Sequence, residues 1–196
     1  MDWILASASP RRKELLAKLI PQFEVLPSNA EEDGLDLLPP KKLVETLAKR
    51  KAEEVAERAC ARGKIVLGSD TVVAYDGKTL GKPADEREAE EMLSRLSGNV
   101  HQVHTGVCIL YPRLDGTRGV IVDSDCTEVE FERLTMGFIK AYIATGSPMD
   151  KAGAYGIQDG GLVKAIHGSF SNVVGLPLEL CEKMISETYE RLRKEK

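Results

Sequence analysis

Several charged side chains in this sequence are of the types that phosphoryl chemistry needs. The candidate cations are Arg11, Arg12, Lys51 and Lys82, and the candidate carboxylates are Asp70 and Glu32. Arginine and lysine can hold phosphate oxygens, whereas a carboxylate can hold a divalent cation or take a proton from water. Because phosphoryl transfer to water uses both kinds of group, these residues together favour that chemistry.

The two arginines lie at the start of a predicted helix. Ser9 is a typical N-cap and Pro10 a typical first helical residue, so Arg11 and Arg12 fall in the first turn. Cations are mildly unfavourable there, because the helix dipole is already positive. With the hydroxyls of Ser7 and Ser9, the turn suits a phosphate or another polyanion. The alternative is a solvated basic turn, and the hydroxyls with the proline-started helix favour the anion site.

Asp70 lies in Gly68-Ser69-Asp70-Thr71, directly after the apolar run 65–67. The run is typical of a buried strand, so we expect Asp70 just beyond a strand end, where ligands of α/β sheets gather. A carboxylate there can bind a divalent cation or activate water. An aspartate that caps its own turn is the alternative. The cations elsewhere in the chain favour the functional interpretation.

Two lysines are candidates for contacts with phosphate. Lys51 interrupts an apolar row of the predicted helix 41–62, which Gly63 would end. It could extend its alkyl stem to solvent or direct its ammonium at a phosphate, and the spacing leaves both open. Lys82 is stiffened by Pro83, although alone it would be an ordinary surface lysine.

Two further candidates lie in predicted loops. Glu32 belongs to the acidic segment 27–40, where Glu31 and Asp33 flank it, so which carboxylate reaches a metal stays open. Gln158 ends a glycine-rich segment, and its amide can both donate to and accept from the edge of a base. Spacing alone does not assign Gln158 a role.

The periodicity predicts a mixture of strands and helices. We expect strands at 3–6, 23–26, 65–67, 72–75, 100–110, 120–131 and 162–166, and helices that begin near Pro10, Lys41, Asp85, Thr135 and Pro177. Asp76-Gly77 predicts a hairpin, and Asp115-Gly116 lies in the link of another. Crossovers and hairpins together favour an α/β or α+β fold around a long mixed sheet.

Composition narrows the class of protein. The chain has 196 residues, 42% of them hydrophobic and 30% charged, which suits one domain or two small lobes with a shared core. Its net charge of −4 argues against a general nucleic-acid-binding protein. We expect no membrane partner, because no apolar run reaches spanning length, and no signal peptide, because Met1-Asp2-Trp3 lacks a basic region.

The cysteines and histidines give no sign of a metal site. Cys60, Cys108, Cys126 and Cys181 are scattered without a C-x-x-C pair, which suits reduced core cysteines in a cytosolic protein better than a disulfide framework or a zinc site. The histidines lack companions at metal spacing, so we interpret them as structural; they are His101, His104 and His167. There is no Walker-type motif, so a P-loop enzyme is not expected.

Taken together, these motifs resemble a known family. Ser7-x-Ser9-Pro10-Arg11-Arg12-x-Glu14-Leu15-Leu16 resembles the N-terminal signature of Maf proteins, the nucleoside triphosphate pyrophosphatases. Further family motifs follow in order, at residues 68–71, 81–83, 96–98, 105–107 and 174–177. The segment 150–158, Asp-Lys-Ala-Gly-Ala-Tyr-Gly-Ile-Gln, resembles the dTTP/UTP branch rather than the branch that acts on 7-methyl-GTP.

The resemblance implies one domain over residues 1–196, with an elongated mixed α/β sheet flanked by helices. It implies two lobes with a nucleotide cleft and a fold related to inosine triphosphate pyrophosphatases. It also implies hydrolysis of a nucleoside triphosphate to the monophosphate and pyrophosphate with a divalent cation, Mg²⁺ or Mn²⁺. Asp70 would be the proton acceptor, and Arg11, Thr71 and Gln158 would set specificity. Family members are commonly cytoplasmic, often dimeric, and linked to arrest of septum formation, so we expect a homodimer.

We therefore expect dTTP, UTP or modified pyrimidine nucleotides as substrates, with water attacking the α-phosphate. The expected substrate-binding residues are Ser7, Ser9, Arg11, Arg12, Lys51, Thr71, Lys82 and Gln158. Asp70 and Glu32 are the expected metal ligands. Two alternatives stay open: a 7-methyl-GTP pyrophosphatase, and a nucleotide-binding regulator of cell division with little turnover.

Overall fold

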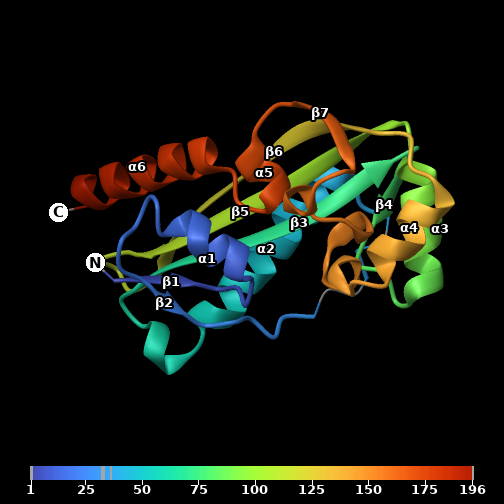
Figure 1. The fold of residues 1–196 in the computed structure, drawn as a ribbon. Helices are drawn as coiled ribbons and strands as arrows, with labels where there is room; N and C mark the ends of the chain where they lie inside the picture. Colours follow the sequence, from blue (N-terminus) through green and yellow to red (C-terminus); the bar gives the residue numbers. More distant parts are fainter. Residues whose placement is uncertain (1, 32–33, 36, 196) are drawn as a thin grey trace. The chain divides into compact units, whose positions relative to one another are not determined.

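The computed structural model describes residues 2–31, 34–35 and 37–195 (Figure 1). Its strands are β1 (Trp3–Leu5), β2 (Glu24–Val25), β3 (Ile65–Tyr75), β4 (Lys78–Leu80), β5 (Val100–Pro112), β6 (Arg118–Phe131) and β7 (Val163–His167). Its α-helices are α1 (Pro10–Leu16), α2 (Pro40–Ala56), α3 (Glu86–Leu96), α4 (Met136–Ile143), α5 (Phe170–Val174) and α6 (Leu178–Lys194). Single 3₁₀ turns are η1 (Ala59–Ala61), η2 (Ser147–Asp150), η3 (Ala152–Ala154) and η4 (Ile157–Asp159).

The strands form one mixed sheet of seven strands in the order β2-β1-β3-β5-β6-β7, with β4 paired to β3. Strand β1 is parallel to β2 and β3, whereas β4 is antiparallel to β3 and β7 is antiparallel to β6. Ile4 is in register with Glu24 on one side and with Val66 on the other. The predicted mixed sheet flanked by helices is confirmed. Across the described ranges, none of the helices combines the length and the apolar character needed to cross a membrane.

The chain forms two compact units, and each has its own core. The first unit comprises residues 1–70, 105–125 and 175–196, and the second comprises residues 71–104 and 126–174. In the first unit, alanines of α2 pack with apolar residues of β1, β3 and β5. In the second unit, α3 and α4 lie side by side and contribute Leu93, Ile139 and their neighbours to the core (Figure 1).

Helix α2 lies unusually close to two strands of the first unit. A Cβ built on Gly68 of β3 would lie 2.3 Å from the carbonyl oxygen of Ala48, and one on Gly106 of β5 would lie 2.2 Å from that of Val44. Non-bonded contacts this short essentially never occur for a real Cβ atom, so only glycine allows α2 to approach the strand at either position. The two glycines therefore fix the distance between α2 and the strands that carry the candidate site.

Helix α2 ends at Ala56, earlier than the predicted end near Arg62, and the 3₁₀ turn η1 follows. The guanidinium of Arg118 on β6 donates hydrogen bonds to the carbonyls of Ala56 (3.1 Å), Ala61 (2.9 Å) and Lys64 (3.1 Å). Carbonyls at a helix end lack partners within the helix, and a distant arginine supplies them here. Because Arg118 comes from another part of the chain, the spacing within 41–62 could not reveal this helix end.

Replacement of Arg118 with methionine is expected to lower the free energy of unfolding by about 3 kcal/mol, because it removes the hydrogen bonds that Arg118 donates to half-buried carbonyls. Urea unfolding followed by circular dichroism measures this value. Arg87 is the matched control, since it is an exposed arginine that pairs with Glu91 on α3. Arg87→Met should change stability by less than about 0.5 kcal/mol. Equal effects of the two substitutions would contradict the capping role of Arg118.

The core of the second unit contains a buried histidine. Nε2 of His101 lies 2.8 Å from the hydroxyl of Tyr155, and its ring meets the edge of Phe131. Nδ1 of His101 is buried without a hydrogen-bond partner in the described structure. Burial lowers the pKa of His101 to about 4, because protonation would place an unsatisfied N–H and a charge in this core.

Acid is therefore expected to destabilise the fold through His101. The unfolded chain takes up a proton near pH 6.5, whereas the folded chain does so only near pH 4, so stability falls as the pH drops through this window. The full contribution is about 3 kcal/mol. Urea titrations at several pH values should show a shallower loss in His101→Gln than in the wild type. The exposed His167→Gln is the control, and a His101→Gln slope equal to that of His167→Gln would contradict the assignment.

Candidate functional site

Asp70 lies inside strand β3. The sequence had suggested a position just beyond the end of a strand, so this expectation is wrong. The strand continues from Leu67 through Gly68-Ser69-Asp70-Thr71 to Tyr75. These small and polar residues are typical of turns, but here they continue the strand, and α2 packs against it at Gly68. Ser69 is fully buried and Asp70 is only 7% exposed. The carboxylate is therefore held by a rigid strand and not by a loop.

The alternation of the strand directs Asp70 at α2. Side chains two residues apart share one face of a strand, so Asp70 lies on the same face as Gly68. The Gly68 face meets the α2 backbone at Ala48 and Ala52, and the next side chain along that face is Asp70. There Oδ1 of Asp70 lies 2.5 Å from Nζ of Lys51. The residue that interrupts the apolar row of α2 is thus the partner of the candidate catalytic carboxylate.

The Lys51–Asp70 pair is largely shielded from water. The side chain of Lys51 is 16% exposed and that of Asp70 is 10% exposed. Loss of one partner from a shielded ion pair leaves an uncompensated charge, so each residue holds the other in position. The sequence left open whether Lys51 extends to solvent or serves the site, and its contact with Asp70 places it at the candidate site.

The turn between β1 and α1 forms the second part of the site in the first unit. Ser9 caps α1 by accepting a hydrogen bond from the Arg12 backbone N–H (3.4 Å), and the Ser9 N–H donates to Oγ of Ser7 (3.2 Å). Nε of Arg12 donates to the carbonyl of Gly175 (2.9 Å), which also accepts from Oγ of Ser69 (3.2 Å). The shared carbonyl connects the predicted anion turn to the residue beside Asp70.

The anion turn is thus ordered by contacts of its own. The guanidinium of Arg12 donates to the Gly175 carbonyl and to Oγ of Ser7. Arg11 is the preceding residue of the same short helix, and it is half-buried. The sequence did not single out Ser69 or Gly175 as site residues. Their only signal was membership of the motifs 68–71 and 174–177, because the bond between them joins residues 106 positions apart.

Three candidate residues belong to the second unit. Thr71 follows Asp70 along β3 and points to the opposite face, Lys82 is exposed just after β4, and Gln158 is exposed in η4. The N–H of Gly153 donates to the carbonyl of Gly81 (2.9 Å), which joins the loop that carries Gln158 to the segment that carries Lys82.

Glu32, the expected second metal ligand, lies outside the described residues. Within the part of the chain that the structure describes, no group of three or more His, Cys, Asp or Glu side chains is arranged to hold a metal ion. The candidate metal ligand that can be placed is therefore Asp70.

Comparison with known proteins agrees with the motifs. The family described as Maf-like protein matches residues 2–188. A protein of Thermococcus onnurineus named dTTP/UTP pyrophosphatase is 50% identical over 183 residues, which cover 92% of this chain and 95% of that protein. A protein of Clostridium perfringens with the same name is 47% identical over 193 residues, which cover 97% of this chain and 98% of that protein.

Solved structures share the fold at low sequence identity. The Staphylococcus aureus Ham1 protein aligns with a TM-score of 0.54 at 16% identity, over 96% of this chain and 100% of that one. A HAM1 protein from Coxiella burnetii aligns with a TM-score of 0.51 at 15% identity, over 95% and 99%. These similarities support the arrangement of the strands and helices.

Proposed function

This chain belongs to the Maf family, and from that membership we propose that it hydrolyses dTTP and UTP to the monophosphate and pyrophosphate. The relatives that carry this activity in their names span nearly the whole chain. The observation that carries the proposal is the shielded Asp70–Lys51 pair. The residue before Asp70 is Ser69, whose hydroxyl donates to the Gly175 carbonyl, and Arg12 donates to the same carbonyl. These contacts connect the carboxylate proposed to accept a proton, Asp70, with Arg12, one of the cations proposed to hold phosphate.

Asp70 orients and deprotonates the water that attacks the α-phosphorus. An ammonium has three N–H donors, so Lys51 can hold Asp70 and also bind a phosphate oxygen. The phosphate contacts come from Ser7, Ser9, Arg11, Arg12, Lys51 and Lys82. Pyrophosphate bound to such cations is a good leaving group, so the reaction needs no covalent nucleophile.

A divalent cation, Mg²⁺ or Mn²⁺, fits this set of donors. Mg²⁺ in phosphoryl-transfer sites is usually held by one or two carboxylates together with substrate phosphates, and Asp70 supplies one such carboxylate. Glu32 is the proposed second ligand. When bound, the cation would neutralise charge on the triphosphate and on the departing pyrophosphate.

The choice of base is proposed to depend on Arg11, Thr71 and Gln158. An amide suits uracil and thymine, whose edges offer both a donor and an acceptor. A site built for those hydrogen bonds rejects bases that leave its groups unpaired. Modified pyrimidine nucleotides are also proposed as substrates, because the cell needs its ordinary dTTP and UTP. We further propose that the protein is cytoplasmic, forms a homodimer and binds no nucleic acid.

Product analysis tests the proposal. Purified protein is incubated with Mg²⁺ or Mn²⁺ and a panel of nucleoside triphosphates that includes 7-methyl-GTP, and the products are separated by ion exchange. We expect monophosphate and pyrophosphate from dTTP and UTP, with purine nucleotides spared. Preferential cleavage of 7-methyl-GTP would assign the chain to the other branch. Diphosphate with phosphate would contradict attack at the α-phosphorus, and binding without turnover would favour a nucleotide-binding regulator.

A further inference from the structure

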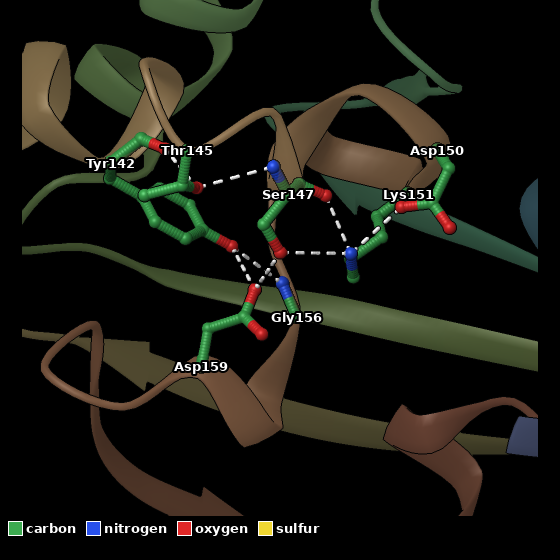
Figure 2. A network of polar contacts seen from close by, with 7 residues as sticks. All are labelled: Tyr142, Thr145, Ser147, Asp150, Lys151, Gly156 and Asp159. Atoms are coloured by element: carbon green, nitrogen blue, oxygen red, sulfur yellow. Dashed lines mark hydrogen bonds and ion pairs between the residues drawn. The ribbon is translucent and has the colours of Figure 1, made fainter.

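A chain of hydrogen bonds surrounds the turn that carries Gln158 in the second unit (Figure 2). The hydroxyl of Tyr142 on α4 donates to Oδ2 of Asp159 (2.5 Å), and the hydroxyl of Ser147 donates to the same oxygen (2.7 Å). The ammonium of Lys151 donates to Oγ of Ser147 (3.0 Å) and to its carbonyl oxygen (2.5 Å). The Asp159 carboxylate is thus fixed by two hydroxyls, one of which is itself held by a lysine.

The Tyr142 hydroxyl holds both ends of the turn. It donates to Asp159, the last residue of η4, and it accepts a hydrogen bond from the N–H of Gly156 (3.0 Å), the residue before η4. The turn is closed by its own bond from the Asp159 N–H to the Gly156 carbonyl (3.0 Å). Gln158 therefore lies between two points that a single phenol fixes.

The support for this phenol is firm. Tyr142 is only 8% exposed, and its ring belongs to the core of the second unit. Burial and the neighbouring Asp159 raise the pKa of Tyr142, so the phenol remains protonated and able to donate. The turn itself is exposed, so the packed core below it and the hydrogen bonds of Tyr142 and Ser147 hold it in place.

The turn is also sterically confined. A Cβ built on Gly156 would lie 2.8 Å from Oδ2 of Asp159 and 2.8 Å from Cε of Lys151. The backbone of Gly156 has a negative φ that any residue adopts, so a methyl group there would push on the side-chain ends of Asp159 and Lys151 without straining the backbone. Gly156→Ala therefore displaces the network without removing any of its polar groups.

We propose that Tyr142, Ser147 and Asp159 form a clamp that positions Gln158, and that this clamp sets the preference for uracil and thymine over cytosine. The inference rests on the proposed function, in which Gln158 reads the base. An amide can present its donor and acceptor in either order, and the clamp does not fix that rotation. The clamp fixes the backbone from which Gln158 extends, and with it the distance and direction from which the amide meets the edge of the base.

The test compares kcat/KM for UTP and for CTP, with variants of the clamp and of Gln158. The ratio of the two values is independent of the fraction of active protein, so a purely structural loss does not change it. We expect Tyr142→Phe and Gly156→Ala each to lower the ratio about tenfold, because small displacements of a positioning group have effects of this order. Gln158→Leu should remove most of the preference.

Tyr155→Phe is the matched control, because it removes a phenol of the same loop whose hydroxyl forms a hydrogen bond with His101. It should keep the wild-type ratio even if its melting temperature falls. Full discrimination in Tyr142→Phe and Gly156→Ala, with loss in Gln158→Leu, would overturn the clamp and leave the proposed function intact. A wild type that does not hydrolyse UTP would instead overturn the proposed function. A wild type that cleaves CTP as well as UTP would overturn the preference assigned to the clamp and leave the proposed function intact.

Discussion

Replacing Asp70 with asparagine is expected to lower kcat/KM for dTTP and UTP by about 10²–10⁴-fold, the range for loss of a general base. The amide keeps the size of the side chain and an oxygen for Lys51, but it cannot accept the proton of the attacking water. The effect should appear in kcat through loss of the base and also in KM, because Asp70 is proposed to hold the cation and contacts Lys51. Initial rates of pyrophosphate release over a range of substrate concentrations measure it.

The matched control for this substitution is Asp123→Asn, because Asp123 is a partly exposed aspartate of the first unit. It should retain wild-type kinetics. Asp70→Asn also leaves Lys51 without its counter-charge in a shielded site, so unfolding curves of both variants set an assay temperature at which each is folded. Near-native turnover of folded Asp70→Asn would contradict the assignment of Asp70 as the base.

Gly68→Ala is expected to have a large effect on stability. The added methyl group would lie 2.3 Å from the carbonyl oxygen of Ala48 and 2.9 Å from the N atom of Ala52. Both are backbone atoms of a packed helix, so α2 must move away from β3. Overpacking of this kind lowers the free energy of unfolding by about 3 kcal/mol. Because Lys51 lies on α2, activity should fall beyond the loss of folded protein.

Gly81→Ala is the matched control, since a Cβ on Gly81 would meet no heavy atom within 4 Å. Its carbonyl can still accept from Gly153, so we expect stability close to that of the wild type. Urea unfolding of both variants tests the comparison. A Gly68→Ala protein as stable as Gly81→Ala would show that α2 and β3 are not in the close contact described above.

Features that depend on neighbouring residues could be predicted from the sequence. Ser9, Asp85 and Thr135 each cap a helix by accepting from the N–H three residues later, as the spacing predicts. Asp76 and Gly77 have the positive φ angles of the predicted hairpin turn between β3 and β4. In these cases the groups that decide the conformation lie within one turn of chain.

Features that depend on distant residues could not be predicted. The polar segment after Leu67 continues β3, and α2 packs against it at Gly68. Helix α2 ends where a side chain of β6 donates hydrogen bonds to its carbonyls. The contact of Lys51 with Asp70 spans 19 positions, and that of Arg12 with Gly175 spans 163. The motifs marked these residues as candidates, but only the packing of the elements shows which of them meet.

The clamp of Tyr142 is a further case of this kind. In the sequence Tyr142 has the spacing of a core residue of α4, and it is one, since its ring is buried. Its hydroxyl nevertheless reaches Asp159, which lies 17 positions later. An apolar pattern shows which side chains are buried, but it gives no information about the polar tip of a tyrosine.

In the proposed reaction, water activated by Asp70 attacks the α-phosphorus. The most direct measurement is hydrolysis of UTP in water labelled with heavy oxygen, followed by mass spectrometry of both products. Attack at the α-phosphorus places the label in UMP and leaves pyrophosphate unlabelled, which is the predicted result. Label in the pyrophosphate would mean attack at the β-phosphorus, and it would contradict the role assigned here to Asp70.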